Sequence, residues 1–86
     1  MTKATIRVLV VDDHPIVRRG ISAEINLDPE MSVIGEAQNG LEAVEMARQL
    51  KPDVILMDLV MPQMDGVEAT RQIIAANPDA QVLILT

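Results

Sequence analysis

The sequence predicts an α/β fold with a doubly wound parallel sheet. Four apolar runs alternate with three stretches in which apolar residues recur at helical spacing, an order typical of parallel strands covered by helices on both faces. The 86 residues suffice for one hydrophobic core, so we expect residues 1–86 to form a single domain. Hydrophobic residues make up 49% of the chain and aromatic residues 0%, which indicates a globular protein with an aliphatic core.

The first strand and the first helix are predicted near the N-terminus. The run Ile6–Val11 is almost wholly apolar and rich in β-branched residues, which indicates a strand buried on both faces. Pro15 suits the first position of a helix, and apolar residues recur after it at helical spacing. Asp28 and Pro29 end this helix, because a residue before proline is disfavoured in the α region.

The second strand and the second helix are bounded by turn residues. Met31–Ala37 is predicted as a weaker strand, and Asn39 is a candidate N-cap for a helix over 41–50. Lys51 and Pro52 end that helix. Its apolar stripe comprises Ala43, Val44, Ala47 and Leu50.

The third and fourth strands enclose the last helix. Val54–Met57 is a short apolar run closed by Asp58, and 81–86 is the final strand. Between them Gly66 leads into a helix over 67–76. We expect four residues of this helix to face inward: Val67, Thr70, Ile73 and Ile74.

The composition argues against several classes of site. A net charge of −6 does not suit a nucleic-acid backbone or an anionic membrane surface. The chain has no cysteine, so disulfides, thiolate zinc sites and cysteine nucleophiles are excluded. The first apolar run is too short for a signal peptide or a membrane span, so we expect a cytoplasmic protein.

Three aspartates follow the first and third strands. Asp12 and Asp13 come after the first strand, and Asp58 comes after the third. If the strand order is 2-1-3-4, these strand ends are adjacent, and ligands of such sheets bind there. Three close carboxylates need a cation, and Mg²⁺ suits oxygen ligands. Each aspartate alone could cap a helix or begin a turn, but their convergence favours a metal site.

The polar neighbours of these acids have simpler interpretations. His14 is interpreted as a loop position before a helix, although it could touch a metal or a phosphate. Arg18 and Arg19 are interpreted as a solvated helix face.

Two motifs resemble the receiver domain of two-component response regulators. They are VLVVDDHP, which ends at Pro15, and VILMDLVMPQMDG, which ends at Gly66. Residues 6–86 match the first four strands and three helices of that family, and DDHPIVRRG resembles the subfamily joined to helix-turn-helix DNA-binding domains. The resemblance implies a flavodoxin-like receiver fold with strand order 2-1-3-4.

The resemblance also implies a role for each site residue. Asp58 would be the phosphoacceptor, a carboxylate nucleophile that forms an aspartyl phosphate. Asp13, Asp58 and the backbone carbonyl of Val60 would bind Mg²⁺, with Asp12 acting partly through water. The Thr86 hydroxyl would donate a hydrogen bond to a phosphoryl oxygen.

The expected function is a phosphorylation-controlled signalling switch, not an enzyme. The phosphodonor would be a sensor histidine kinase or a phosphotransfer protein, and the complete protein would control transcription through a DNA-binding output domain. One alternative is a Mg²⁺-dependent phosphohydrolase, but such enzymes usually need an acid where this chain has Val60. A second alternative is an inert interaction module that keeps the acids without the chemistry.

The family's lysine on a fifth strand has no counterpart in these 86 residues. We therefore expect a receiver truncated after the fourth strand, which phosphorylates poorly. We also expect a homodimer or higher oligomer, because the fourth strand would be an unprotected edge. The stripe of the first helix, which includes Val17, Ile21 and Ile25, would be partly uncovered.

Overall fold

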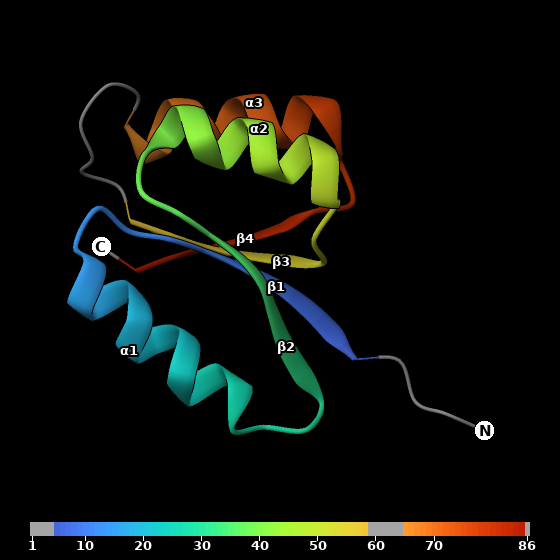
Figure 1. Ribbon diagram of the computed structural model, residues 1–86. Helices are drawn as coiled ribbons and strands as arrows, with labels where there is room; N and C mark the ends of the chain where they lie inside the picture. The colour runs from blue at the N-terminus through green and yellow to red at the C-terminus, as the bar shows by residue number, and fades with distance from the viewer. Residues whose placement is uncertain (1–4, 59–64, 86) are drawn as a thin grey trace.

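A computed structural model describes residues 5–58 and 65–85, which form a four-stranded sheet (Figure 1). Its strands are β1 (Ile6–Val11), β2 (Met31–Ala37), β3 (Val54–Met57) and β4 (Gln81–Ile84). All neighbouring strands are parallel, and their order is β2-β1-β3-β4. The parallel sheet and the strand order implied by the resemblance are confirmed.

The helices lie on both faces of the sheet. They are α1 (Pro15–Asn26), α2 (Gly40–Leu50) and α3 (Gly66–Ala76). Figure 1 shows α1 on one face, with α2 and α3 side by side on the other. This arrangement confirms the doubly wound architecture.

Local signals fix the helix ends close to the predicted residues, although α2 and α3 each begin one residue earlier than predicted, at Gly40 and Gly66. Pro15 occupies the first turn of α1, and the side chain of Asn39 accepts a 2.8 Å hydrogen bond from the backbone N–H of Glu42 at the start of α2. Lys51 ends α2 in the left-handed conformation, with φ of 50°. Asp65 caps α3 in the same way as Asn39 caps α2.

The core lies where the two central strands meet the helices. Leu9, Val10, Val11, Ile55 and Met57 are completely buried. Alanines of α2 and α3, among them Ala43, Ala47 and Ala69, fill the narrow space above the sheet. The described core is aliphatic, as the composition predicts.

The inward face predicted for the last helix is wrong for two of its four residues. Val67 and Ile74 are 63% and 42% exposed, whereas the buried residues of α3 are Gly66, Ala69 and Ile73. Thr70 is half-buried. The helix contacts α2, and its buried residues Ala69 and Ile73 share one core cluster with Ile55 and Met57 of β3, so the face turned towards α2 and β3 is the buried one.

Within the described residues, no helix combines the length and the apolar character needed to cross a membrane.

Candidate functional site

The three predicted aspartates meet at the carboxyl edge of the sheet. Backbone hydrogen bonds continue past the strand ends and hold them there. The N–H of Asp12 donates to the carbonyl of Ala37 at 3.1 Å, and the N–H of Asp58 donates to that of Val11 at 3.0 Å. One ligand atom from each of Asp12, Asp13, His14 and Asp58 lies within 4.8 Å of the others. We call these four residues the acid cluster.

The two aspartates after β1 have different environments. Asp12 is buried, and its Oδ1 accepts a 2.8 Å hydrogen bond from the backbone N–H of His14. The same oxygen lies 2.9 Å from His14 Nδ1. Asp13 is partly exposed, but its Oδ1 is buried and accepts no hydrogen bond from the described residues, although His14 Nδ1 lies 3.0 Å away. Asp12 is thus already engaged, whereas a buried oxygen of Asp13 still lacks a donor.

His14 contacts the acids more closely than its interpretation as a loop residue implies. It does precede α1 in an extended conformation, and its side chain is 67% exposed. The hydrogen bond to Asp12 and the charge of Asp13 raise the pKa of His14, because both stabilise the imidazolium. The raised pKa reflects the negative potential of the acid cluster.

The interpretation of Arg18 as a solvated residue is wrong. Its side chain is only 13% exposed, and its Nε lies 3.0 Å from a carboxylate oxygen of Glu36 on β2. One terminal nitrogen donates a 2.9 Å hydrogen bond to the backbone carbonyl of Asp12. Arg19, by contrast, is exposed. No local pattern links Arg18 with Glu36, because only the packing of α1 against β2 brings them together.

A cavity of about 630 Å³ opens beside the acid cluster. Its lining residues are Asp12, Asp13, His14, Val17, Ile21, Asp58 and Leu85. The polar part of the lining comprises three aspartates and His14, and the rest is apolar. A hydrated cation and a phosphoryl group would both fit a cavity of this size.

The acid cluster fits a hard divalent cation. Three carboxylates place ligand oxygens within 4.8 Å of one another, and the buried Oδ1 of Asp13, which accepts no hydrogen bond from the described residues, could bind the cation instead. Negative charges this close repel one another, and a bound cation would offset that repulsion. Val60 and Thr86, to which the resemblance also assigns roles, lie outside the described residues.

Comparisons with known proteins identify the family. The sequence model of one protein family, the response regulator receiver domain, matches residues 8–86 of this chain. The transcriptional regulatory protein LiaR of Bacillus subtilis is 53% identical over 81 residues, which are 94% of this chain and 38% of LiaR. A protein-glutamate methylesterase/protein-glutamine glutaminase of Shewanella denitrificans is 60% identical over 74 residues, which are 86% of this chain and 19% of that protein.

The solved structures agree with the sequence comparisons. The response regulator domain of Thermotoga maritima CheB superposes with a TM-score of 0.90 at 46% identity, over 93% of this chain and 59% of that one. This chain therefore belongs to the response regulator receiver domain family. It is homologous to the receivers of phosphorylation-dependent response regulators, and it spans well under half the length of LiaR.

Proposed function

We propose that this chain is a signalling switch that accepts a phosphoryl group on Asp58. The observation that carries the proposal is the acid cluster, in which residues from two distant parts of the sequence bring their ligand atoms within 4.8 Å. Asp58 is half-buried at the end of β3 and lines the open cavity, so a phosphodonor can reach it. Asp12 and Asp13 follow β1, so Asp58 is the one acid of the cluster that follows β3.

The transfer needs little chemistry from the protein beyond positioning and charge compensation. A carboxylate oxygen of Asp58 would form the new bond to phosphorus as the bond from phosphorus to the donor's histidine nitrogen breaks. The nitrogen keeps the bonding electron pair. The products are an aspartyl phosphate and, once the released ring nitrogen has taken up one proton from water, the neutral histidine of the donor.

Mg²⁺ is the cation we propose for the acid cluster. Asp13 and Asp58 would bind it directly, with the carbonyl of Val60, and Asp12 would act partly through water because its Oδ1 already accepts hydrogen bonds from His14. When bound, the ion would neutralise the acids and the incoming phosphoryl charge. The hydroxyl of Thr86 would donate a hydrogen bond to the phosphoryl group.

The proposed partners follow from the family. Receivers of two-component systems accept phosphoryl groups from histidine kinases, so we propose a sensor histidine kinase or phosphotransfer protein as the donor. In the complete protein, we propose that phosphorylation controls transcription through a DNA-binding output domain. The name of the LiaR relative, a transcriptional regulatory protein, supports this proposal.

We also propose that residues 1–86 form one receiver unit that does not turn over substrate. The methylesterase relative is matched over only 19% of its length, so the likeness concerns its receiver segment. The competing hypothesis is a Mg²⁺-dependent phosphohydrolase with an aspartyl nucleophile. Repeated release of inorganic phosphate from an ester by this chain would favour the hydrolase, whereas one stoichiometric phosphorylation would favour the switch.

The phosphoacceptor is tested by intact-mass measurement after incubation with acetyl phosphate and Mg²⁺. Asp58→Asn should abolish the incorporation of one phosphoryl group, because the amide is not a nucleophile at this position. The matched control is Asp65→Asn, which retains a good helix cap outside the acid cluster. Slow phosphorylation of the parent still allows the test, because the fraction of phosphorylated protein is compared between parent and variants at the same incubation times. Equal labelling of Asp58→Asn and the parent would overturn the assignment.

A further inference from the structure

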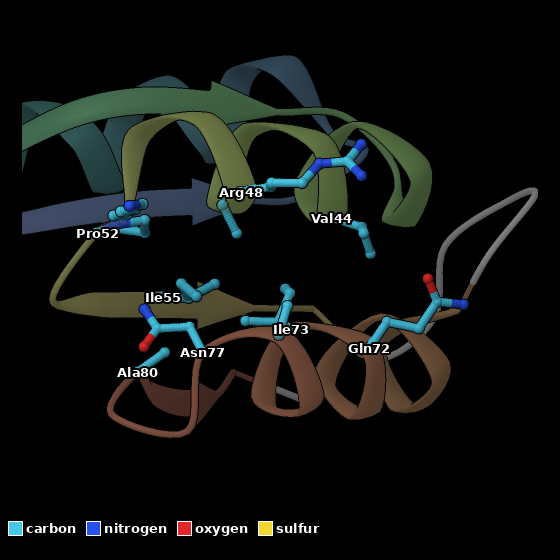
Figure 2. Close-up of a pocket in the computed structure, with 11 residues that line it drawn as sticks. Val44, Arg48, Pro52, Ile55, Gln72, Ile73, Asn77 and Ala80 are labelled. Carbon is cyan, nitrogen blue, oxygen red and sulfur yellow. The ribbon is translucent and has the colours of Figure 1, made fainter.

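A second cavity lies between α2 and α3 (Figure 2). Residues that precede β3 and β4 line it, whereas the acid cluster follows the ends of β1 and β3. Its volume is about 420 Å³, within the range of small-molecule sites. It is lined by Val44, Ala47, Arg48, Lys51, Pro52, Ile55, Gln72, Ile73, Ala76, Asn77 and Ala80. We call it the α2–α3 cavity.

The floor of the α2–α3 cavity is apolar and built from core residues. Figure 2 shows the side chains of Ile55 on β3 and Ile73 on α3 directed into the space between the helices. Ala47 and Ala80, both buried, complete this floor. An apolar group placed there would leave water for a preformed hydrophobic surface, which favours binding in proportion to the area covered.

The mouth of the cavity is positively charged. Arg48 and Lys51 are its charged lining residues, and none of the lining residues is acidic, although the chain as a whole carries a net charge of −6. Arg48 also pairs with Glu45 one turn earlier, outside the lining. In the part of the chain that the structure describes, Lys51 forms no ion pair.

The backbone fixes Lys51 at this mouth. Its left-handed conformation ends α2, and its carbonyl accepts a 2.7 Å hydrogen bond from the guanidinium of Arg7 on β1. A cation held beside an apolar floor is complementary to a molecule with an apolar body and a single negative group.

From this geometry we infer that the α2–α3 cavity is a binding site for small organic carboxylates with a flat or branched apolar body. The apolar body would lie on Ile55 and Ile73, and the carboxylate would accept hydrogen bonds from Lys51 and Arg48. Residues before β3 and before β4 line this cavity, whereas the acid cluster follows the ends of the strands. The two sites are therefore separate, and the inference does not depend on phosphorylation of Asp58.

The probes are naphthoate and its neutral amide, titrated into the ¹⁵N-labelled chain while amide chemical shifts are recorded. Naphthoate should saturate with a Kd below about 1 mM and should shift the amides of 44–55 and 72–80. Naphthamide, the neutral probe, should bind at least about threefold more weakly than naphthoate, because it lacks the negative charge that Lys51 and Arg48 attract. Equal affinity of the two probes would overturn the proposal, as would shifts centred on α1 and β4 or no saturation by about 5 mM.

Matched variants separate the site from general surface effects. Arg48→Gln and Arg71→Gln each remove an exposed cation paired with a glutamate three residues earlier, but only Arg48 lines the cavity. Arg48→Gln should weaken the binding of naphthoate about twofold to fivefold, and Arg71→Gln should leave its affinity unchanged.

A second pair of variants tests the size of the cavity. Ala76→Leu should fill the cavity and weaken naphthoate binding more than about tenfold, whereas Ala75→Leu, the neighbouring residue outside the lining, should leave it unchanged. Equal effects of the two arginine variants, or of the two alanine variants, would overturn the assignment. If Ala76→Leu fails to fold, the two arginine variants still test it.

Discussion

Arg18 connects three elements at the residue scale, because it lies on α1, pairs with Glu36 on β2 and donates to the carbonyl of Asp12 after β1. This contact holds the backbone from which Asp12 and Asp13 extend. Arg18 is therefore a positioning residue for the acid cluster. The acids themselves crowd negative charge, so the cluster depends on such external hydrogen bonds to keep its geometry.

Replacing Arg18 should lower both stability and Mg²⁺ affinity. Arg18→Gln leaves the carbonyl of Asp12 and the carboxylate of Glu36 without their donor, and we expect a loss of about 1–2 kcal/mol in the free energy of unfolding. Urea titration measures the stability, and NMR titration with Mg²⁺ measures the affinity. The control is Arg19→Gln on the exposed side of α1, which should change stability by less than about 0.5 kcal/mol. Equal effects of the two variants would contradict the positioning role.

At the scale of elements, the end of α2 depends on a residue from the other end of the chain. The guanidinium of Arg7 donates to the carbonyls of Leu50 and Lys51, at 2.6 and 2.7 Å. These carbonyls have no partner within the helix, and a cation there also compensates the negative end of the helix dipole. The contact fastens α2 to β1.

Removing this cap should destabilise the fold. Arg7→Met keeps the aliphatic stem but removes the two hydrogen bonds, and we expect the free energy of unfolding to fall by about 1–2 kcal/mol. Arg71→Met on the exposed face of α3 is the control and should cost less than about 0.5 kcal/mol. Thermal or urea unfolding compares the two variants. A cost for Arg7→Met no larger than that of the control would show that the cap contributes little.

Two glycines should respond to alanine in opposite directions. A Cβ at Gly35 on β2 would lie 2.8 Å from Met46 Cε and 3.0 Å from Leu50 Cδ1, so the ends of these two side chains must move to admit it. Because the ends of both side chains are adaptable, we expect Gly35→Ala to cost about 1 kcal/mol of unfolding free energy. A Cβ at Gly20 on α1 meets nothing within 4 Å, and Gly20→Ala should stabilise by about 0.5–1 kcal/mol. The same sign for both variants in urea unfolding would refute this account of the packing.

On the scale of the whole molecule, apolar residues lie uncovered on one side. Leu83 and Ile84 on the edge strand β4 are 54% and 43% exposed, and Val17 on the nearby α1 is 49% exposed. Among the described residues no further strand pairs with the outer side of β4, and neither a charge nor a proline interrupts 82–84. We therefore propose that the 86-residue chain associates with itself into a homodimer or higher oligomer through this side.

Sedimentation at micromolar concentration tests the association. The parent should sediment as a dimer or larger, and Leu83→Lys should shift it towards the monomer because a charge on an edge strand opposes pairing. Val67→Lys is the control, since Val67 is 63% exposed on α3, which lies on the opposite face of the sheet from α1. A monomer of 9.4 kDa for the parent, or equal effects of the two lysines, would contradict the proposal.

Much of the fold could be predicted from the sequence because its signals are local. β1, β2 and β3 begin and end at the predicted residues, and β1 and β3 coincide with apolar runs closed by an acid. β4 begins at Gln81 as predicted but ends at Ile84, so the predicted extension through Leu85 is wrong. Asn39 is a cap because its partner is three residues away. The aspartates of the acid cluster stand directly after strands, so the order of the strands was enough to bring them together.

Other features were decided only by the tertiary structure. The apolar residues of α3 cover more than one face, and only the closeness of α2 selects Ala69 and Ile73 over Val67 and Ile74. The contacts of Arg18 and Arg7 join residues far apart in the sequence, and no local periodicity encodes such a pairing. The α2–α3 cavity likewise exists only where two helices leave space above β3. The sequence by itself therefore determined the elements and the acids at their ends, while packing, which depends on distant neighbours, decided which faces are buried and which charges are paired.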